Sequence, residues 1–150
     1  MTDDAPVRRM LQLREDAGQQ LRAGHLEQAR TLANELLTLA EQTPRGWNHG
    51  NAIHHGHLIL GHVALIEGDL QRASAELLAA GHTPGSPQLN SFGPNCALAR
   101  DLLEAGQVEP VLEFLEACGT FWKMDFGRRS KWMRQIREKQ VPDFGANLVY

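Results

Sequence analysis

A short pattern occurs three times in the chain and constrains the fold more than any other feature. Each copy has a leucine three residues before a glycine, an aliphatic residue two after it, and a small or aliphatic residue five after it. The copies are LRAGHLEQA at 21–29, LIEGDLQRA at 65–73 and LEAGQVEPV at 103–111. A glycine ends a helix at little steric cost because it accepts the left-handed conformation. The pattern therefore predicts three tight turns, each joining two helices.

The central copy lies in the clearest amphipathic stretch, residues 60–84. After Gly68, the apolar residues Leu70, Ala73, Leu77 and Ala80 recur at spacings of three and four, which is typical of one buried helix face. Asp69 is a favourable residue to cap the start of this helix. Small residues before and after the turn would let the two helix backbones approach closely.

The segments around the three turns predict an all-α fold of three helical hairpins in one domain. The hairpins are expected over about 6–43, 48–82 and 94–119, followed by a further helix over about 127–139. Residues 81–94 contain three glycines and three prolines, so we expect a long loop there. The tail at 140–150 ends in Leu148, Val149 and Tyr150, and these apolar residues predict that it packs on the domain in an ordered conformation.

Composition excludes several classes of protein. The chain has 150 residues and a net charge of −3, which argues against nucleic acid as the partner. No apolar run approaches the length of a membrane span, so we expect no membrane partner. The acidic start MTDDAP lacks the basic region of a signal peptide, and two cysteines are too few for a disulfide framework. These observations favour the cytoplasm.

The repeated pattern resembles the tetratricopeptide repeat family. The central unit carries the resemblance best, and its matching residues are Leu60, Gly61, Ala64, Gly68, Leu70, Ala73, Leu77 and Ala80. The outer units depart from the family pattern at Ala33, where a large residue is usual, and at Val111, where a small one is usual. The repeat spacing also exceeds the family's usual value of about 34 residues. The resemblance implies a right-handed superhelix closed by a capping helix at 127–139.

Proteins of this family bind peptides in the groove lined by the first helix of each hairpin, and the resemblance places such a groove here. Its expected lining residues are Leu11, Arg14, Gly18 and Arg22, then His55, Leu58, His62 and Leu65, then Gly93, Cys96, Arg100 and Leu103. Asn51, Asn90 and Asn95 would supply hydrogen bonds from the rim. Arg14 and Arg100, together with His55 and His62, would favour an anionic or carboxylate-bearing protein or peptide segment.

Five of the seven histidines lie between residues 49 and 62, and this cluster has three interpretations. His54 and His57 are three apart and could share a metal ion, whereas His55 and His62 lie about 10 Å apart along a helix, too far for that. Imidazoles in a cleft could also perform acid–base chemistry. In the third interpretation the rings satisfy backbone groups as part of the packing.

The sequence thus predicts a non-catalytic module that binds a protein or peptide segment and needs no cofactor. The alternative is a small enzyme or metal-binding protein built on His54, His55, His57 and His62. A third hypothesis is a self-associating scaffold, a homodimer for example, that uses Trp47, Trp122 and Trp132 as exposed aromatic residues.

Overall fold

The computed structural model describes residues 5–44, 46 and 48–149. These residues form eight α-helices and no strand, which confirms the all-α class. The helices are α1 (Ala5–Arg22), α2 (Leu26–Gln42), α3 (His49–Ile66), α4 (Leu70–Gly81), α5 (Pro87–Phe92), α6 (Ala97–Glu104), α7 (Val108–Cys118) and α8 (Arg128–Arg137). A short 3₁₀ helix, η1 (Gly145–Leu148), lies in the tail.

The three repeated turns have one geometry. Gly24, Gly68 and Gly106 adopt φ angles of +81°, +84° and +85°, which confirms the predicted left-handed helix ends. In each turn the residue after the glycine donates its N–H to a carbonyl five residues back, at 2.9 Å. This bond satisfies one carbonyl at the end of the first helix, so the chain reverses without leaving that group unpaired.

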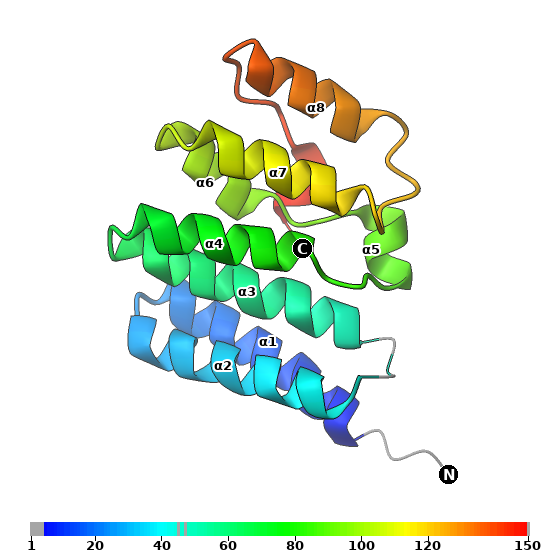
Figure 1. The fold of residues 1–150 in the computed structure, drawn as a ribbon. Coiled ribbons are helices and arrows are strands. Elements are labelled where there is room, and N and C mark those ends of the chain that lie inside the picture. The colour runs from blue at the N-terminus through cyan, green and yellow to red at the C-terminus, as the bar shows by residue number, and fades with distance from the viewer. Residues whose placement is uncertain (1–4, 45, 47, 150) are drawn as a thin grey trace.

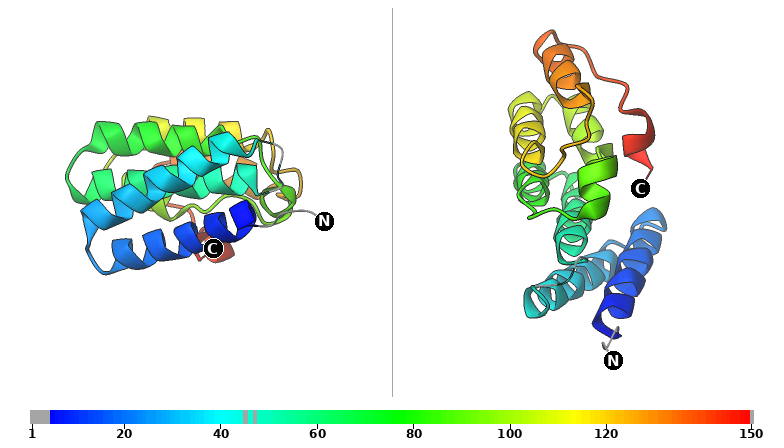
Figure 2. Two further views of the ribbon diagram at one scale, coloured as in Figure 1. Left: turned by 90° about the horizontal axis from the view of Figure 1, so that it is seen from below. Right: turned by 90° about the vertical axis from the view of Figure 1, so that its right-hand side faces the viewer.

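The helices are arranged in two layers (Figures 1 and 2). The first helices of the hairpins, α1, α3 and α6, contact one another in sequence, while α2, α4 and α7 lie beside them in the second layer. Helix α8 packs on α7 at one end of the stack. Among the described helices, none is both long and apolar enough to cross a membrane.

Small residues occur on the helices where two helix backbones approach closely. An added Cβ at Gly56 of α3 would lie 2.7 Å from the Leu37 side chain of α2, so any larger residue would require that side chain to move. At the other end of the stack the space between helices is filled by large residues. The core there includes Leu77, Leu98, Leu102, Phe114, Leu115, Phe121, Trp122, Trp132, Met133, Ile136 and Phe144.

The prediction that residues 81–94 form only a loop is wrong. This segment contains α5, which begins where Ser86 accepts the N–H of Leu89 at 3.0 Å and Pro87 occupies the first turn. It ends at Gly93, whose φ of +84° and close contact with the Trp122 ring admit no side chain. The signals for this helix were a serine cap and a proline, but the surrounding glycines and prolines concealed them.

The tail is ordered and packed on the domain. Phe144 is buried, and its ring lies edge-on to Trp132 at 5.0 Å between centroids. The expectation that Trp122 and Trp132 are exposed is wrong, because they are 2% and 4% exposed in the core. Trp47 lies outside the described residues. The tryptophans of the described chain therefore provide no surface for self-association.

Candidate functional site

A groove of about 340 Å³ runs between the first helices of the hairpins and the tail. Helices α1 and α3 form two walls, the start of α6 forms one end, and the tail covers the remaining side. The lining residues are Arg14, Glu15, Gly18, Leu21, Arg22, His55, Leu58, Ile59, His62, Asn95, Ala97, Leu148 and Val149. We call this cavity the groove.

A second cavity of about 320 Å³ adjoins the groove and shares Arg14 and His55 with it. It is lined by Arg14, Asn51, His55, Gln88, Leu89, Phe92 and Gly93, and thus lies between α1, α3 and α5. We call it the side pocket. The unpredicted helix α5 supplies its outer wall, since Leu89 and Phe92 both lie on that helix.

The structure brings together five of the seven residues that the sequence predicts for the site. Arg14, His55, His62 and Asn95 line the groove, and Asn51 lines the side pocket together with Arg14 and His55. Their gathering from α1, α3 and the start of α6 follows from the stacking of the first helices in one layer.

Asn90 and Arg100 lie outside both cavities. The Asn90 side chain accepts the N–H of Lys123 at 3.0 Å and so holds the segment after α7. Arg100 lies 3.3 Å from Asp101 on the same helix. Cys96, predicted to face the groove, is fully buried in the core. Local hydrogen bonding and burial therefore account for these three residues.

Arg14 and His55 are the two residues that the groove and the side pocket share. Within the described chain, neither side chain makes a hydrogen bond or an ion pair, although both are partly buried. Burial lowers the pKa of Arg14, and the neighbouring Glu15 opposes this shift. Burial also lowers the pKa of His55 well below its usual value, with smaller contributions from His54 and Arg14. The site at neutral pH thus presents a cationic guanidinium beside a neutral imidazole.

His62 extends this polar surface along α3. Burial lowers its pKa, while Asp101 raises it and Arg100 lowers it further. His62 is therefore also neutral at neutral pH. Arg100 thus influences the groove through its charge without lining it.

His54 performs a structural task, as in the packing interpretation of the histidine cluster. Its Nδ1 donates to the carbonyl of Ala80 at 3.0 Å, and its Nε2 accepts the N–H of Asn95 at 3.1 Å. Burial lowers the pKa of His54 to about 4, so the ring stays neutral. Both nitrogens are occupied, and the ring joins α3 to the end of α4 and the start of α6.

The two histidines that could have shared a metal ion are committed to different partners. His57 contacts Glu76 at 2.7 Å between Nδ1 and Oε2, whereas both nitrogens of His54 bind backbone groups. Across residues 5–44, 46 and 48–149, no group of three or more histidine, cysteine, aspartate or glutamate side chains is placed to hold an ion. The geometry therefore does not bring His54 and His57 to one metal centre.

The tail completes the groove. Asn147 is fully buried and donates from Nδ2 to the carbonyls of Phe92 and Pro94, both at 2.9 Å. Its own carbonyl accepts the N–H of Cys96 at 2.7 Å. These bonds place the next residues, Leu148 and Val149, in the groove wall. Sequence reasoning predicted that the tail packs, but no local signal identified its position.

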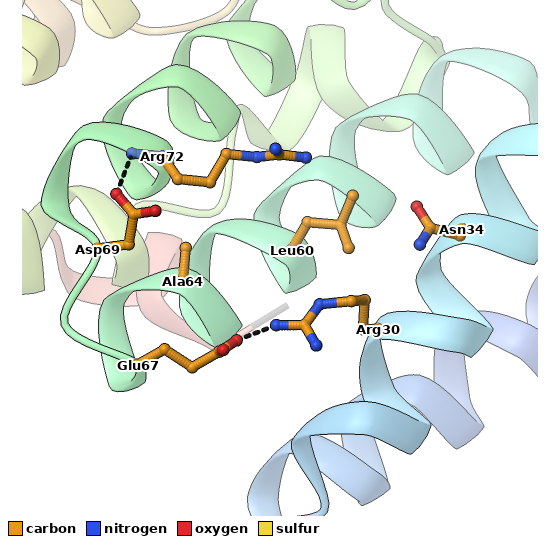
Figure 3. A pocket seen from close by; sticks show the side chains of 7 residues that line it. All are labelled: Arg30, Asn34, Leu60, Ala64, Glu67, Asp69 and Arg72. Atoms are coloured by element: carbon orange, nitrogen blue, oxygen red, sulfur yellow. Dashed lines mark hydrogen bonds and ion pairs between the residues drawn. The ribbon is translucent and has the colours of Figure 1, made fainter.

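A third cavity, of about 310 Å³, lies on the opposite side of α3, between α2 and α4 (Figure 3). Arg30 makes an ion pair with Glu67 across it, and Asp69 accepts the backbone N–H of Arg72 at 3.0 Å. The Arg72 side chain is paired in turn with Glu76 at 2.9 Å. The two arginines of this cavity are thus already paired with carboxylates, whereas Arg14 of the groove makes no ion pair within the described residues.

Comparison with known proteins identifies no relative. No protein-family model matches the chain, and neither the curated proteins nor the solved structures include a significant match.

Proposed function

We propose that this protein is a non-catalytic module that binds a protein or peptide segment in the groove of a tetratricopeptide-like helical array. The observation that carries the proposal is the gathering of Arg14, His55, His62 and Asn95 along one groove formed by successive first helices. The three equivalent glycine turns and the two-layer packing support the tetratricopeptide-like assignment. We place the module in the cytoplasm, and its two free, buried cysteines agree with a reducing compartment.

The chemistry of the groove suits an extended segment. Leu58 and Ile59 provide an apolar floor, while His62 and Asn95 add polar groups. The opposite wall is the tail itself, whose backbone carbonyl at Asn147 accepts the N–H of Cys96, the residue before α6. A cavity of this volume with a few convergent polar groups is a typical binding site for a side chain or a small ligand.

A selection from a library of random peptides tests this proposal. We expect peptides enriched on the wild-type protein to lose binding to a variant with His55→Ala and His62→Ala. Both histidines are only partly buried and His55 makes no hydrogen bond in the described structure, so the variant should keep its fold, which thermal unfolding would verify.

The matched control removes two histidine side chains that lie outside the groove. His25 and His82 are exposed and lie outside the groove, so the variant with both changed to alanine should bind the selected peptides normally. Failure to enrich any peptide, or equal binding by both double variants, would contradict the proposed function.

A further inference from the structure

The side pocket has a composition that narrows the class of ligand. Leu89 and Phe92 supply an apolar surface, and Asn51 and Gln88 supply amides. Arg14 carries the only formal charge among its described lining residues at neutral pH, because His55 is neutral and no acidic side chain lines it. Glu15 lines the groove but not the side pocket. The side pocket therefore favours a ligand with a single negative charge.

The cation of the side pocket and one amide near it have no acceptor in the described chain. The guanidinium of Arg14 makes no hydrogen bond within the described residues, and burying such a group without a partner is costly. Asn48, which is 3% exposed, lies next to Arg14 in a small adjoining cavity, and its Nδ2 has no partner in the described chain. Arg14 of α1 and Asn48, the residue before α3, thus line one small cavity, and each carries N–H groups without a partner in the described chain.

We infer that the side pocket binds a carboxylate attached to an apolar group, with the carboxylate on Arg14 and the apolar group against Leu89 and Phe92. The inference rests on the proposed function, since it identifies the residue type by which a bound segment is anchored: an acidic residue adjacent to an aromatic or aliphatic one.

The geometry of the groups favours a carboxylate over a phosphate. Arginine presents two parallel N–H groups that match the two oxygens of a carboxylate. A phosphate group carries close to two negative charges at neutral pH, and the single cation of the side pocket would balance only one of them. The pocket volume of about 320 Å³ lies at the lower end of the range for ligand sites, which suits a carboxylate with a small apolar group attached.

Three small molecules serve as probes of the full chain. Phenylpropionate carries both groups, phenylpropanamide has the same shape without the charge, and propionate lacks the ring. Titrations followed by calorimetry and by backbone amide NMR shifts should show phenylpropionate binding at least about tenfold more tightly than phenylpropanamide, because a hydrogen bond to a charged group is lost in the amide. The shifts should include residues of α5.

Two matched arginine variants test which cation binds the carboxylate of the probe. Arg14→Gln should abolish the preference for the carboxylate, whereas Arg22→Gln, which removes an exposed cation from the groove alone, should preserve it. Phe92→Ala should weaken phenylpropionate but leave propionate unchanged, and Phe92 is 61% exposed, so this variant should fold. Thermal unfolding checks the fold of each variant.

The outcomes separate this inference from the proposed function. Equal binding of carboxylate and amide, absence of phenylpropionate binding, or equal effects of the two arginine variants would overturn the carboxylate assignment. Peptide binding that depends on His55 and His62 would then still support the groove. Loss of that peptide binding with intact phenylpropionate binding would instead overturn the proposed function and leave the side pocket as a small-molecule site.

Discussion

His57 and Glu76 form a contact of 2.7 Å between Nδ1 and Oε2 that joins α3 to α4. The Glu76 side chain is 8% exposed, and its other oxygen accepts from Arg72 Nε at 2.9 Å. Burial by itself raises the pKa of Glu76, but the bonds to His57 and Arg72 outweigh it and lower the pKa overall. A buried carboxylate is tolerated here because both of its oxygens are paired.

Changing Glu76 should destabilise the protein more than changing its arginine partner. Glu76→Gln keeps the shape but removes the charge that His57 and Arg72 require, and we expect a loss of about 1–3 kcal/mol in the free energy of unfolding. Arg72→Gln affects a side chain that is 63% exposed, so its loss should stay below about 1 kcal/mol. Urea denaturation measures both, and a larger loss for Arg72→Gln would contradict this ranking.

The protein should become less stable as the solution is acidified. His54 has a pKa of about 4 in the folded state, below the usual value of 6.5 expected for the unfolded chain. The unfolded state therefore binds the proton first, and stability falls as pH drops from about 6.5 to about 4, by about 3 kcal/mol from this residue alone. Burial of His55 shifts its pKa in the same direction and adds to the loss.

Denaturation curves at a series of pH values test this prediction. His54→Leu removes the titrating ring, so the variant should be less stable at neutral pH but should lose less stability on acidification. A pH dependence identical to that of the wild type would show that His54 is not the group responsible.

Gly50 should tolerate no side chain. A Cβ at this position would lie 1.8 Å from the carbonyl oxygen of Gly85, which is backbone and cannot rotate away. We expect Gly50→Ala to cost about 3 kcal/mol or more, or to shift the start of α3. Gly56→Ala is the control, because its Cβ meets the flexible end of Leu37. Thermal unfolding should show the larger loss at Gly50.

The tail should detach when Asn147 can no longer donate. In Asn147→Asp the side chain keeps its shape but loses both bonds to the carbonyls of Phe92 and Pro94, and we expect a loss of about 2–4 kcal/mol. Asn90→Asp is the matched control, since Asn90 acts as an acceptor and the bond from Lys123 survives the change. Faster hydrogen exchange at the Cys96 amide in the first variant alone would confirm the prediction.

Much of the fold was predictable because its signals are local. Each repeated turn depends on one glycine and the leucine before it, and Asp69 caps α4 as predicted, by accepting the N–H of Arg72. The site was predictable in part, since residues on one helix face, such as His55 and His62, must share a surface.

The features that could not be predicted depend on contacts between residues that are distant in sequence. His54 binds groups that lie 26 and 41 residues away, so its sequence context could not distinguish a structural ring from a metal ligand. Asn147 binds carbonyls 55 and 53 residues away, and nothing near it indicates a wall of the groove. The side pocket depends on α5, whose own short signal was hidden among glycines and prolines.

The position of the tail has a consequence for cooperativity. A stack in which each hairpin contacts only its neighbours can fray from its ends, because each unit melts nearly independently. Here Leu148 and Val149 line one cavity with Leu21 and Arg22 of α1, so a segment bound in the groove would contact both the tail and the first hairpin. Occupation of the groove would therefore couple the two ends of the stack, and opening either end would then require more free energy than in the free protein.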